Sequence, residues 1–118
     1  MSRAHMPRRY DSRGFRASWS ALSSPRRREI IRLVWSDEWP ARRIADAFDV
    51  TWPAISQNLR VLKEAGLVKE RRVGTSRLYK ADRAALKPLE SFLRGMWARN
   101  IDRLRLLAEA EERNRSKI

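Results

Sequence analysis

Two short amphipathic segments joined by a very short connection constrain the fold of this 118-residue chain most. The first segment, residues 40–48, places its apolar residues on one side of a helix of about two turns. The second segment follows an N-cap at Thr51, and Gly66 is well placed to end it. Its apolar residues repeat at the i, i+4, i+7 spacing of one helix face, and they are Ile55, Leu59 and Leu62. Two helices linked by about three residues are a helix-turn-helix candidate.

Other elements are predicted on both sides of this pair. A short helix face starts at Phe15, and Ser24-Pro25 begins a second helix that ends near Ser36. Trp39 is placed to cover Ile44 at the start of the 40–48 helix. After Gly66, residues 67–73 and 77–80 predict a small β-hairpin around Gly74-Thr75-Ser76. One long helix then begins at Asp82 or at Lys87-Pro88 and keeps its apolar stripe to about residue 112.

These elements predict a mainly α fold with a small β-hairpin, in the order α-α-α-α-β-β-α. A hairpin that carries arginines and follows a helix-turn-helix is a winged helix-turn-helix. We expect one domain over residues 14–112, a basic disordered arm over residues 1–13 and a tail over residues 113–118. Residues 88–112 as a single helix span about 38 Å, so this helix must project from the body or find a partner. We therefore predict a homodimer built from the first and last helices.

Charge and composition narrow the function. Twenty-seven basic residues against 14 acidic ones give a net charge of +13, concentrated in residues 1–28 and 51–81. A protein with this excess of positive charge is expected to bind a polyanion, and the candidates are DNA, RNA and acidic lipid. The chain has no cysteine and a single histidine, His5, so thiolate or imidazole metal sites and histidine catalysis are not expected, nor is any cofactor. No nucleophile–base arrangement is visible, so we do not expect an enzyme. No stretch approaches the ~18 apolar residues of a membrane span, and we expect a cytoplasmic protein.

The face of the 51–65 helix opposite its apolar stripe is the candidate reading surface. Gln57 can bond an adenine edge and Arg60 a guanine edge, while the basic hairpin can lie along phosphates or in the minor groove. An ordinary solvated helix face and a charged edge hairpin are the alternative interpretations. The candidate DNA contacts are Thr51, Trp52, Pro53, Ser56, Gln57, Arg60, Lys63, Arg71, Arg72, Thr75 and Arg77.

Over residues 15–112 the chain resembles the ArsR/SmtB winged-helix repressors. The resemblance rests on Ser24-Pro-Arg-Arg-Arg-Glu-Ile-Ile, on Arg43-Ile-Ala-Asp-Ala-Phe, on the stretch 51–68 with its Ser-Gln-Asn-Leu-Arg-Val-Leu core, and on Arg77-Leu-Tyr-Lys. It implies a homodimeric repressor that binds an inverted-repeat operator in double-stranded DNA and responds to an effector, here unidentified. The expected dimer-interface residues are Phe15, Trp19, Leu89, Leu93, Met96, Trp97, Ile101 and Leu104.

The chain departs from that family's pattern in two places. Metal-sensing members place Cys-X-Cys on the helix that here spans 40–48, or His/Asp pairs on the last helix, and this chain has neither. It therefore resembles the metal-independent subgroup. Trp52 stands where members often have Gln, and indole cannot make a bidentate adenine contact. Trp52 then packs on a thymine methyl, on a sugar or on Pro53.

Two other functions compete with sequence-specific DNA binding. A basic winged helix can dock on structured RNA, although RNA binding favours exposed stacking aromatics, for which only Trp52 and Tyr10 qualify. A protein-interaction module with a vestigial helix-turn-helix is the third interpretation.

Overall fold

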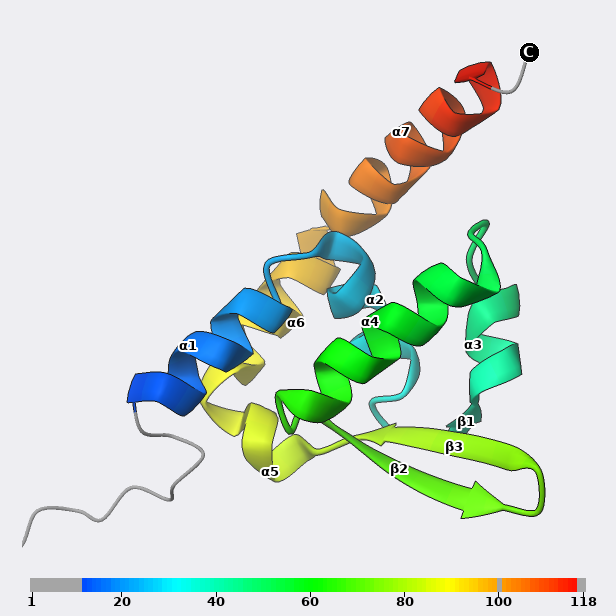
Figure 1. The fold of residues 1–118 in the computed structure, drawn as a ribbon. Coiled ribbons are helices and arrows are strands. Elements are labelled where there is room, and N and C mark those ends of the chain that lie inside the picture. Colours follow the sequence, from blue (N-terminus) through cyan, green and yellow to red (C-terminus); the bar gives the residue numbers. More distant parts are fainter. Residues whose placement is uncertain (1–11, 100, 117–118) are drawn as a thin grey trace, which may run out of the picture.

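The chain forms a helical body with one small sheet, seen in a computed structural model that describes residues 12–99 and 101–116. Figure 1 shows α4 and the β2–β3 hairpin on one side of the body and α7 extending away from it. This arrangement confirms the predicted fold class. The elements in chain order are α1 (Ser12–Ala21), α2 (Pro25–Leu33), β1 (Trp39–Pro40), α3 (Ala41–Asp46), α4 (Trp52–Glu64), β2 (Val68–Val73), β3 (Ser76–Ala81), α5 (Arg83–Leu86), η2 (Lys87–Leu89), α6 (Glu90–Arg99) and α7 (Ile101–Ser116).

Helix ends follow the short-range signals in the sequence. The hydroxyl of Ser24 accepts a hydrogen bond from the backbone N–H of Arg27 at 3.3 Å, and Pro25 occupies the first turn of α2. The hydroxyl of Thr51 likewise accepts from the N–H of Ala54 at 3.4 Å. Gly66 follows α4 with φ +75°, a backbone conformation that favours glycine. The caps predicted at Ser24 and Thr51 and the stop predicted at Gly66 are therefore confirmed.

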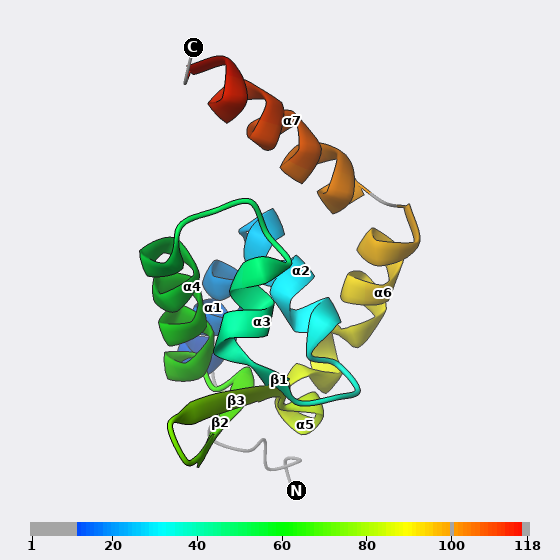
Figure 2. The ribbon, with the colours of Figure 1, turned by 90° about the vertical axis from the view of Figure 1, so that its right-hand side faces the viewer.

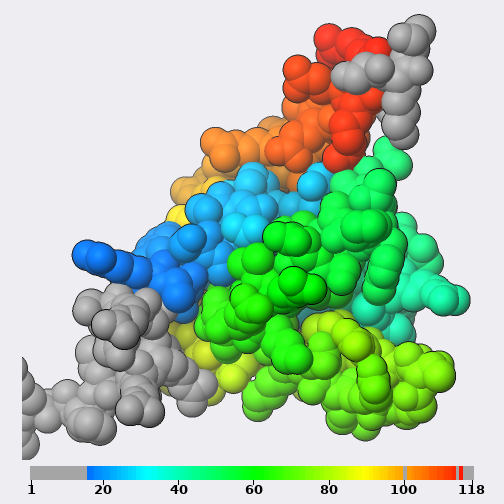
Figure 3. All heavy atoms as spheres, viewed as in Figure 1, coloured from blue at the N-terminus to red at the C-terminus, as the bar shows by residue number. Residues whose placement is uncertain are grey.

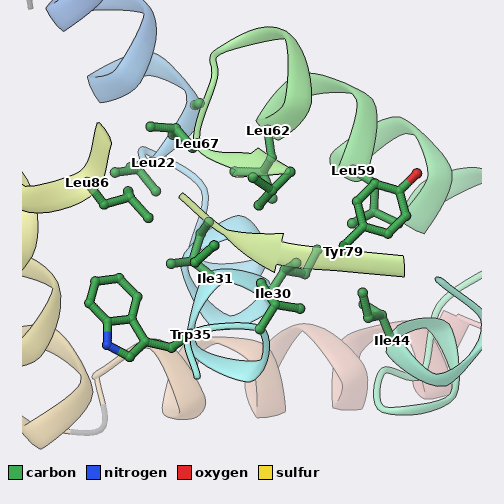
Figure 4. Close-up of a cluster of buried hydrophobic side chains, with 14 of the residues drawn as sticks. Leu22, Ile30, Ile31, Trp35, Ile44, Leu59, Leu62, Leu67, Tyr79 and Leu86 are labelled. Carbon is green, nitrogen blue, oxygen red and sulfur yellow. The ribbon is translucent and has the colours of Figure 1, made fainter. Parts of the chain in front are cut away.

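One hydrophobic core lies where α2, α3 and α4 meet the sheet (Figure 4). The apolar faces predicted for the helices supply it, together with residues that follow α4 and the hairpin. Side chains with no exposed surface are Leu22, Ile30, Ile31, Val34, Ile44, Ile55, Leu62, Leu67, Leu86 and Leu93. This core fixes which face of α4 points outward.

The sheet has one more strand than the sequence predicted. β1, β3 and β2 lie in that order with antiparallel pairing, and Trp39 of β1 is opposite Tyr79 of β3. The helix predicted over residues 40–48 is shorter, because Pro40 is its N-cap residue and α3 spans Ala41–Asp46, while the backbone of Trp39 and Pro40 pairs with β3. Trp39 packs against the core that contains Ile44, as predicted. The hairpin turn is also shorter than predicted, since Ser76 pairs with Val73 around a two-residue turn.

The predicted last helix is divided. The short helices α5 and η2 come first, α6 ends at Arg99, and α7 begins at Ile101 and lies against α2. Figure 2 shows that α6 and α7 run in different directions. The prediction of one helix of about 38 Å is therefore wrong. At the two ends, α1 begins at Ser12 and α7 continues to Ser116, while most of the predicted arm lies outside the described residues.

A buried ion pair accounts for the position of α7. Arg28 of α2 binds both carboxylate oxygens of Asp102, with Nε–Oδ2 at 2.8 Å and Nη2–Oδ1 at 2.7 Å. The two side chains are only 5% and 2% exposed. Arg28 also donates to the backbone carbonyl of Leu22, just after α1. An unpaired charge at this depth is costly, so Asp102 brings the first turn of α7 against α2.

Loss of this pair should destabilise the fold strongly. We expect Asp102→Asn to lower the free energy of unfolding by about 3–5 kcal/mol, because it leaves the Arg28 charge buried without a counter-ion. Glu90→Gln is the matched control, since its partners Arg83 and Arg94 are 54% and 57% exposed and such surface pairs contribute about 1 kcal/mol or less each. Urea unfolding at one fixed protein concentration measures both. Equal, small losses in the two variants would show that the buried pair does not hold α7.

Candidate nucleic-acid interface

The helix α4 presents a polar face to solvent. Its buried side is formed by Ile55, Leu59 and Leu62, which are 0–2% exposed. On the opposite side Gln57 and Arg60 are exposed, and Ser56 is half-buried. The remaining exposed residues predicted to contact DNA on this helix or at its start are Thr51, Trp52, Pro53 and Lys63. A strip of hydrogen-bonding groups therefore follows α4 from its N-terminal end, where helix-turn-helix proteins read the major groove.

The helix α3 supports this face from behind. It packs against both α4 and β3, and the connection from residue 47 to residue 51 leads directly into the α4 cap. In Figure 2, α3 lies beside α4 with the hairpin below both helices. Arg27 of α2 adds a side-chain contact, since its Nη1 donates to Oδ1 of Asn58 at 3.3 Å. The reading face is thus held by neighbours on two sides.

The hairpin pairs like charges across its strands. Arg72 is directly opposite Arg77, and Lys69 is directly opposite Lys80, and all four residues are exposed. Like charges directly opposite each other destabilise an antiparallel pair. Thr75 lies at the exposed tip between them. Two repulsive pairs in one hairpin are unfavourable for a solvated edge, and they suit a surface that neutralises a polyanion.

Two other cations of this surface bind carboxylates of the protein itself. Lys63 of α4 lies 3.3 Å from Oε1 of Glu70 on β2. Arg71 binds both oxygens of Glu38, at 3.0 and 2.7 Å, which ties β2 to the connection before β1. The hydrogen bond and charge of Arg71 hold the pKa of the Glu38 carboxyl below its ordinary value. The sequence did not predict Glu70 and Glu38 as partners, because Glu70 is 7 positions from Lys63 in a different element and Glu38 is 33 positions from Arg71.

Glu70 also binds a tyrosine of the facing strand. The hydroxyl of Tyr79 donates to Oε2 of Glu70 at 2.6 Å. Burial, with this hydrogen bond, raises the pKa of Tyr79 to about 12, while the same bond is the main cause that lowers the pKa of Glu70. Glu70 therefore stays ionised and joins α4 to both strands of the wing. These contacts fix the wing relative to the reading helix.

The expected interface residues differ in how deeply the single chain buries them. Leu89 and Leu93 are 3% and 0% exposed within the single chain, so they belong to its core and offer no surface to a partner. Met96, Trp97 and Ile101 are half-buried, and Trp97 packs edge-to-face on Trp35. Trp19 and Leu104 are exposed, and Leu107 of the same helix as Leu104 is exposed to the same extent. Phe15 lies in α1, but its side chain is outside the described part of the chain.

Metal chemistry has no donor set in the described part of the chain. No group of three or more His, Asp or Glu residues gathers there in a way that could hold a metal ion. The sequence has no cysteine, and its histidine, His5, lies outside the described residues. Within the same residues, no helix has the length and apolar character needed to span a membrane.

Comparisons with known proteins agree with this geometry. A model of a helix-turn-helix domain matches residues 22–71. The transcriptional regulator Rv2034 of Mycobacterium tuberculosis is 34% identical over 94 residues, which are 80% of this chain and 88% of the relative. The transcriptional repressor SdpR of Bacillus subtilis is 32% identical over 69 residues, covering 58% of this chain and 77% of the relative.

A solved structure shares the fold over most of the chain. It is the solution structure of a homodimeric winged helix-turn-helix DNA-binding domain, Mb0332 of Mycobacterium bovis, described as a possible ArsR-family transcriptional regulator. Its TM-score is 0.66 at 25% identity, and the match covers 85% of this chain and 94% of that one. The chain belongs to the ArsR family of winged helix-turn-helix transcriptional regulators. In this ArsR-family chain, α3 and α4 are the helix-turn-helix and β2–β3 is the wing, and the protein is a DNA-binding transcriptional regulator.

The ion pairs of the wing predict unequal effects of two neighbouring arginines. Arg72→Ala should weaken binding to every duplex alike and reduce the slope of log affinity against log salt by ~0.9, because it removes one phosphate contact. Arg71→Ala should change that slope much less, since Glu38 already neutralises its guanidinium. Affinity for a random-sequence duplex, titrated by fluorescence anisotropy at several salt concentrations, measures both. Equal slope changes in the two variants would contradict this division of roles.

Proposed function

We propose that this protein is a homodimeric transcriptional repressor that reads an inverted-repeat operator through α4 and the wing and does not sense a metal. The observation that carries the proposal is the exposed polar strip of α4 beside two like-charged pairs of the wing. Gln and Arg side chains on such a strip can make bidentate contacts to base edges. The exposed cations of the wing supply affinity that does not depend on sequence.

The relatives support the repressor and dimer roles. SdpR, which is 32% identical to this chain over 69 residues, is named a repressor, and the Mycobacterium bovis domain is homodimeric. In a twofold dimer, two copies of α4 reach successive major grooves, so half-site centres lie about 34 Å or a multiple of it apart. The lack of thiolates and of an acidic or histidine cluster in the described residues supports a repressor that does not respond to metal.

Specificity should depend on two side chains of α4. We expect the double variant Gln57→Ala/Arg60→Ala to lose most of the preference for the duplex upstream of its own gene over a scrambled duplex. Each bidentate base contact contributes roughly 1–3 kcal/mol of discrimination, which is about tenfold or more. Weak, salt-sensitive binding should remain, because the wing is unchanged. Neither side chain packs in the core, so the fold should be unaffected.

The assay compares affinities for the two duplexes and adds a structured RNA hairpin as a third competitor. Arg105→Ala, on an exposed part of α7, is the control and should keep the wild-type preference. If the double variant selects its promoter fragment as well as wild type does, α4 does not read the sequence. If the RNA hairpin displaces the promoter duplex at equal concentration, the protein is an RNA-binding winged helix instead.

The dimer should depend on exposed leucines of α7. Leu104 and Leu107 are each 65% exposed and lie three residues apart, on the same side of the helix. We expect wild-type protein to sediment as a dimer and Leu104→Glu/Leu107→Glu to sediment as a monomer with reduced operator affinity. Arg103→Glu changes the charge of the same helix without removing apolar surface, and it should remain dimeric. A monomeric wild type at micromolar concentration would contradict the proposed assembly.

A further inference from the structure

A groove of about 960 Å³ lies between the helix-turn-helix and the tip of the wing. Arg42 and Ala45 of α3 line one part of it, Trp52 lines the part at the start of α4, and Thr75 and Arg77 line the part at the wing. Figure 2 faces the side of the molecule where α3 and the hairpin approach each other. Figure 3 shows α4 and the hairpin as adjoining parts of one continuous surface.

The lining of the groove combines cations, hydroxyls and apolar carbon. Arg42 and Arg77 carry positive charge, and Asp46 is the one carboxylate among the described residues that line it. Arg42 is exposed and forms no ion pair with any described carboxylate. Arg77 is directly opposite Arg72 on the hairpin, and its charge also acts on Glu70, which does not line the groove. The charges therefore favour an anionic occupant.

The apolar part of the lining fits the carbon face of a sugar. Phe48 and Val50, in the connection before α4, lie there with Trp52, which is 52% exposed. At 100° per residue, Trp52 lies about 100° away from the centre of the polar strip formed by Pro53, Gln57 and Arg60. The indole is thus on the flank of the reading face, beside the groove, and away from where base edges are read. A phosphate with its attached deoxyribose matches both parts of the lining.

The position of the groove identifies the strand. A recognition helix in the major groove and a wing over the neighbouring minor groove have one sugar–phosphate backbone between them. We propose that this groove holds that backbone strand, with Arg42 and Arg77 on a phosphate and Trp52 against the adjoining deoxyribose. The inference rests on the proposed DNA-binding function and adds two assignments to it. Arg42 becomes a phosphate contact, and Trp52 becomes a sugar contact that does not read sequence.

The first test measures phosphate contacts on a scrambled duplex. Arg42→Ala should reduce the slope of log affinity against log salt by ~0.9, so that the loss of affinity between 50 and 200 mM salt becomes about 3.5-fold smaller. Arg43→Ala is the matched control, because its guanidinium lies over the Trp39 ring at 4.2 Å and it does not line the groove. The control should keep the wild-type slope. An unchanged slope in Arg42→Ala would overturn the proposal.

The second test asks what Trp52 contacts. Trp52→Ala should weaken the promoter duplex and the scrambled duplex by the same factor, and Trp52→Phe should restore most of the loss. Replacing thymine by uracil throughout the promoter duplex should leave wild-type affinity unchanged, because a sugar contact does not involve the thymine methyl. If Trp52→Ala weakens only the promoter duplex, or if uracil substitution weakens binding to wild type but not to Trp52→Ala, the sugar assignment is wrong.

These outcomes are separable from a failure of the proposed function. Wild-type protein that binds both duplexes equally would refute sequence-specific regulation. In that case the slope of log affinity against log salt, measured for Arg42→Ala on scrambled DNA, would still test whether the groove holds a phosphate. Wild-type protein that binds neither duplex would overturn both. Far-ultraviolet circular dichroism of each variant checks its fold, which should be retained because Arg42 and Trp52 are both exposed.

Discussion

The buried pair between Arg28 and Asp102 is the contact on which the arrangement of the outer helices depends. Arg28 binds both oxygens of Asp102 at the start of α7 and also donates to the carbonyl of Leu22 after α1. One guanidinium therefore joins α1, α2 and α7. Because a single buried charge left unpaired is strongly destabilising, these three elements cannot move apart independently. In the proposed dimer they carry the exposed apolar residues Trp19 and Leu104.

In the wing, by contrast, residues of like charge lie opposite each other on the two strands, which lowers the stability of the hairpin. Glu70 and Glu38 bind cations that position the hairpin, whereas Arg72 and Arg77 lie directly opposite each other on the two strands. A surface that serves only solubility would gain from placing an acid opposite a base. The cost is offset when a phosphate backbone lies against the wing, because it supplies the missing negative charge.

Local signals in the sequence predicted the helix-turn-helix and its reading face, since caps and apolar periodicity act within a few residues. The strand β1 was not predicted because two residues show no strand alternation, and the pairing of Trp39 with Tyr79 of β3 joins segments 40 positions apart. The break between α6 and α7 was missed because the apolar stripe continues through it. The position of α7 depends on Asp102, whose partner Arg28 is 74 positions away in the sequence. No sequence pattern marked Arg42 as a DNA contact, because its position in the groove depends on the hairpin tip.

The helix α2 connects α4, which is proposed to read DNA, with α7, which is proposed to form the dimer. Arg27 reaches toward α4 through Asn58, and its neighbour Arg28 reaches toward α7 through Asp102. Adjacent residues of one helix turn thus set the position of the reading helix relative to the dimer helix. In a twofold dimer that relation fixes the distance between the two copies of α4, which must equal a whole number of DNA turns of about 34 Å. In the proposed repressor, an effector that moves α2 or breaks one of these two arginine contacts would change this distance.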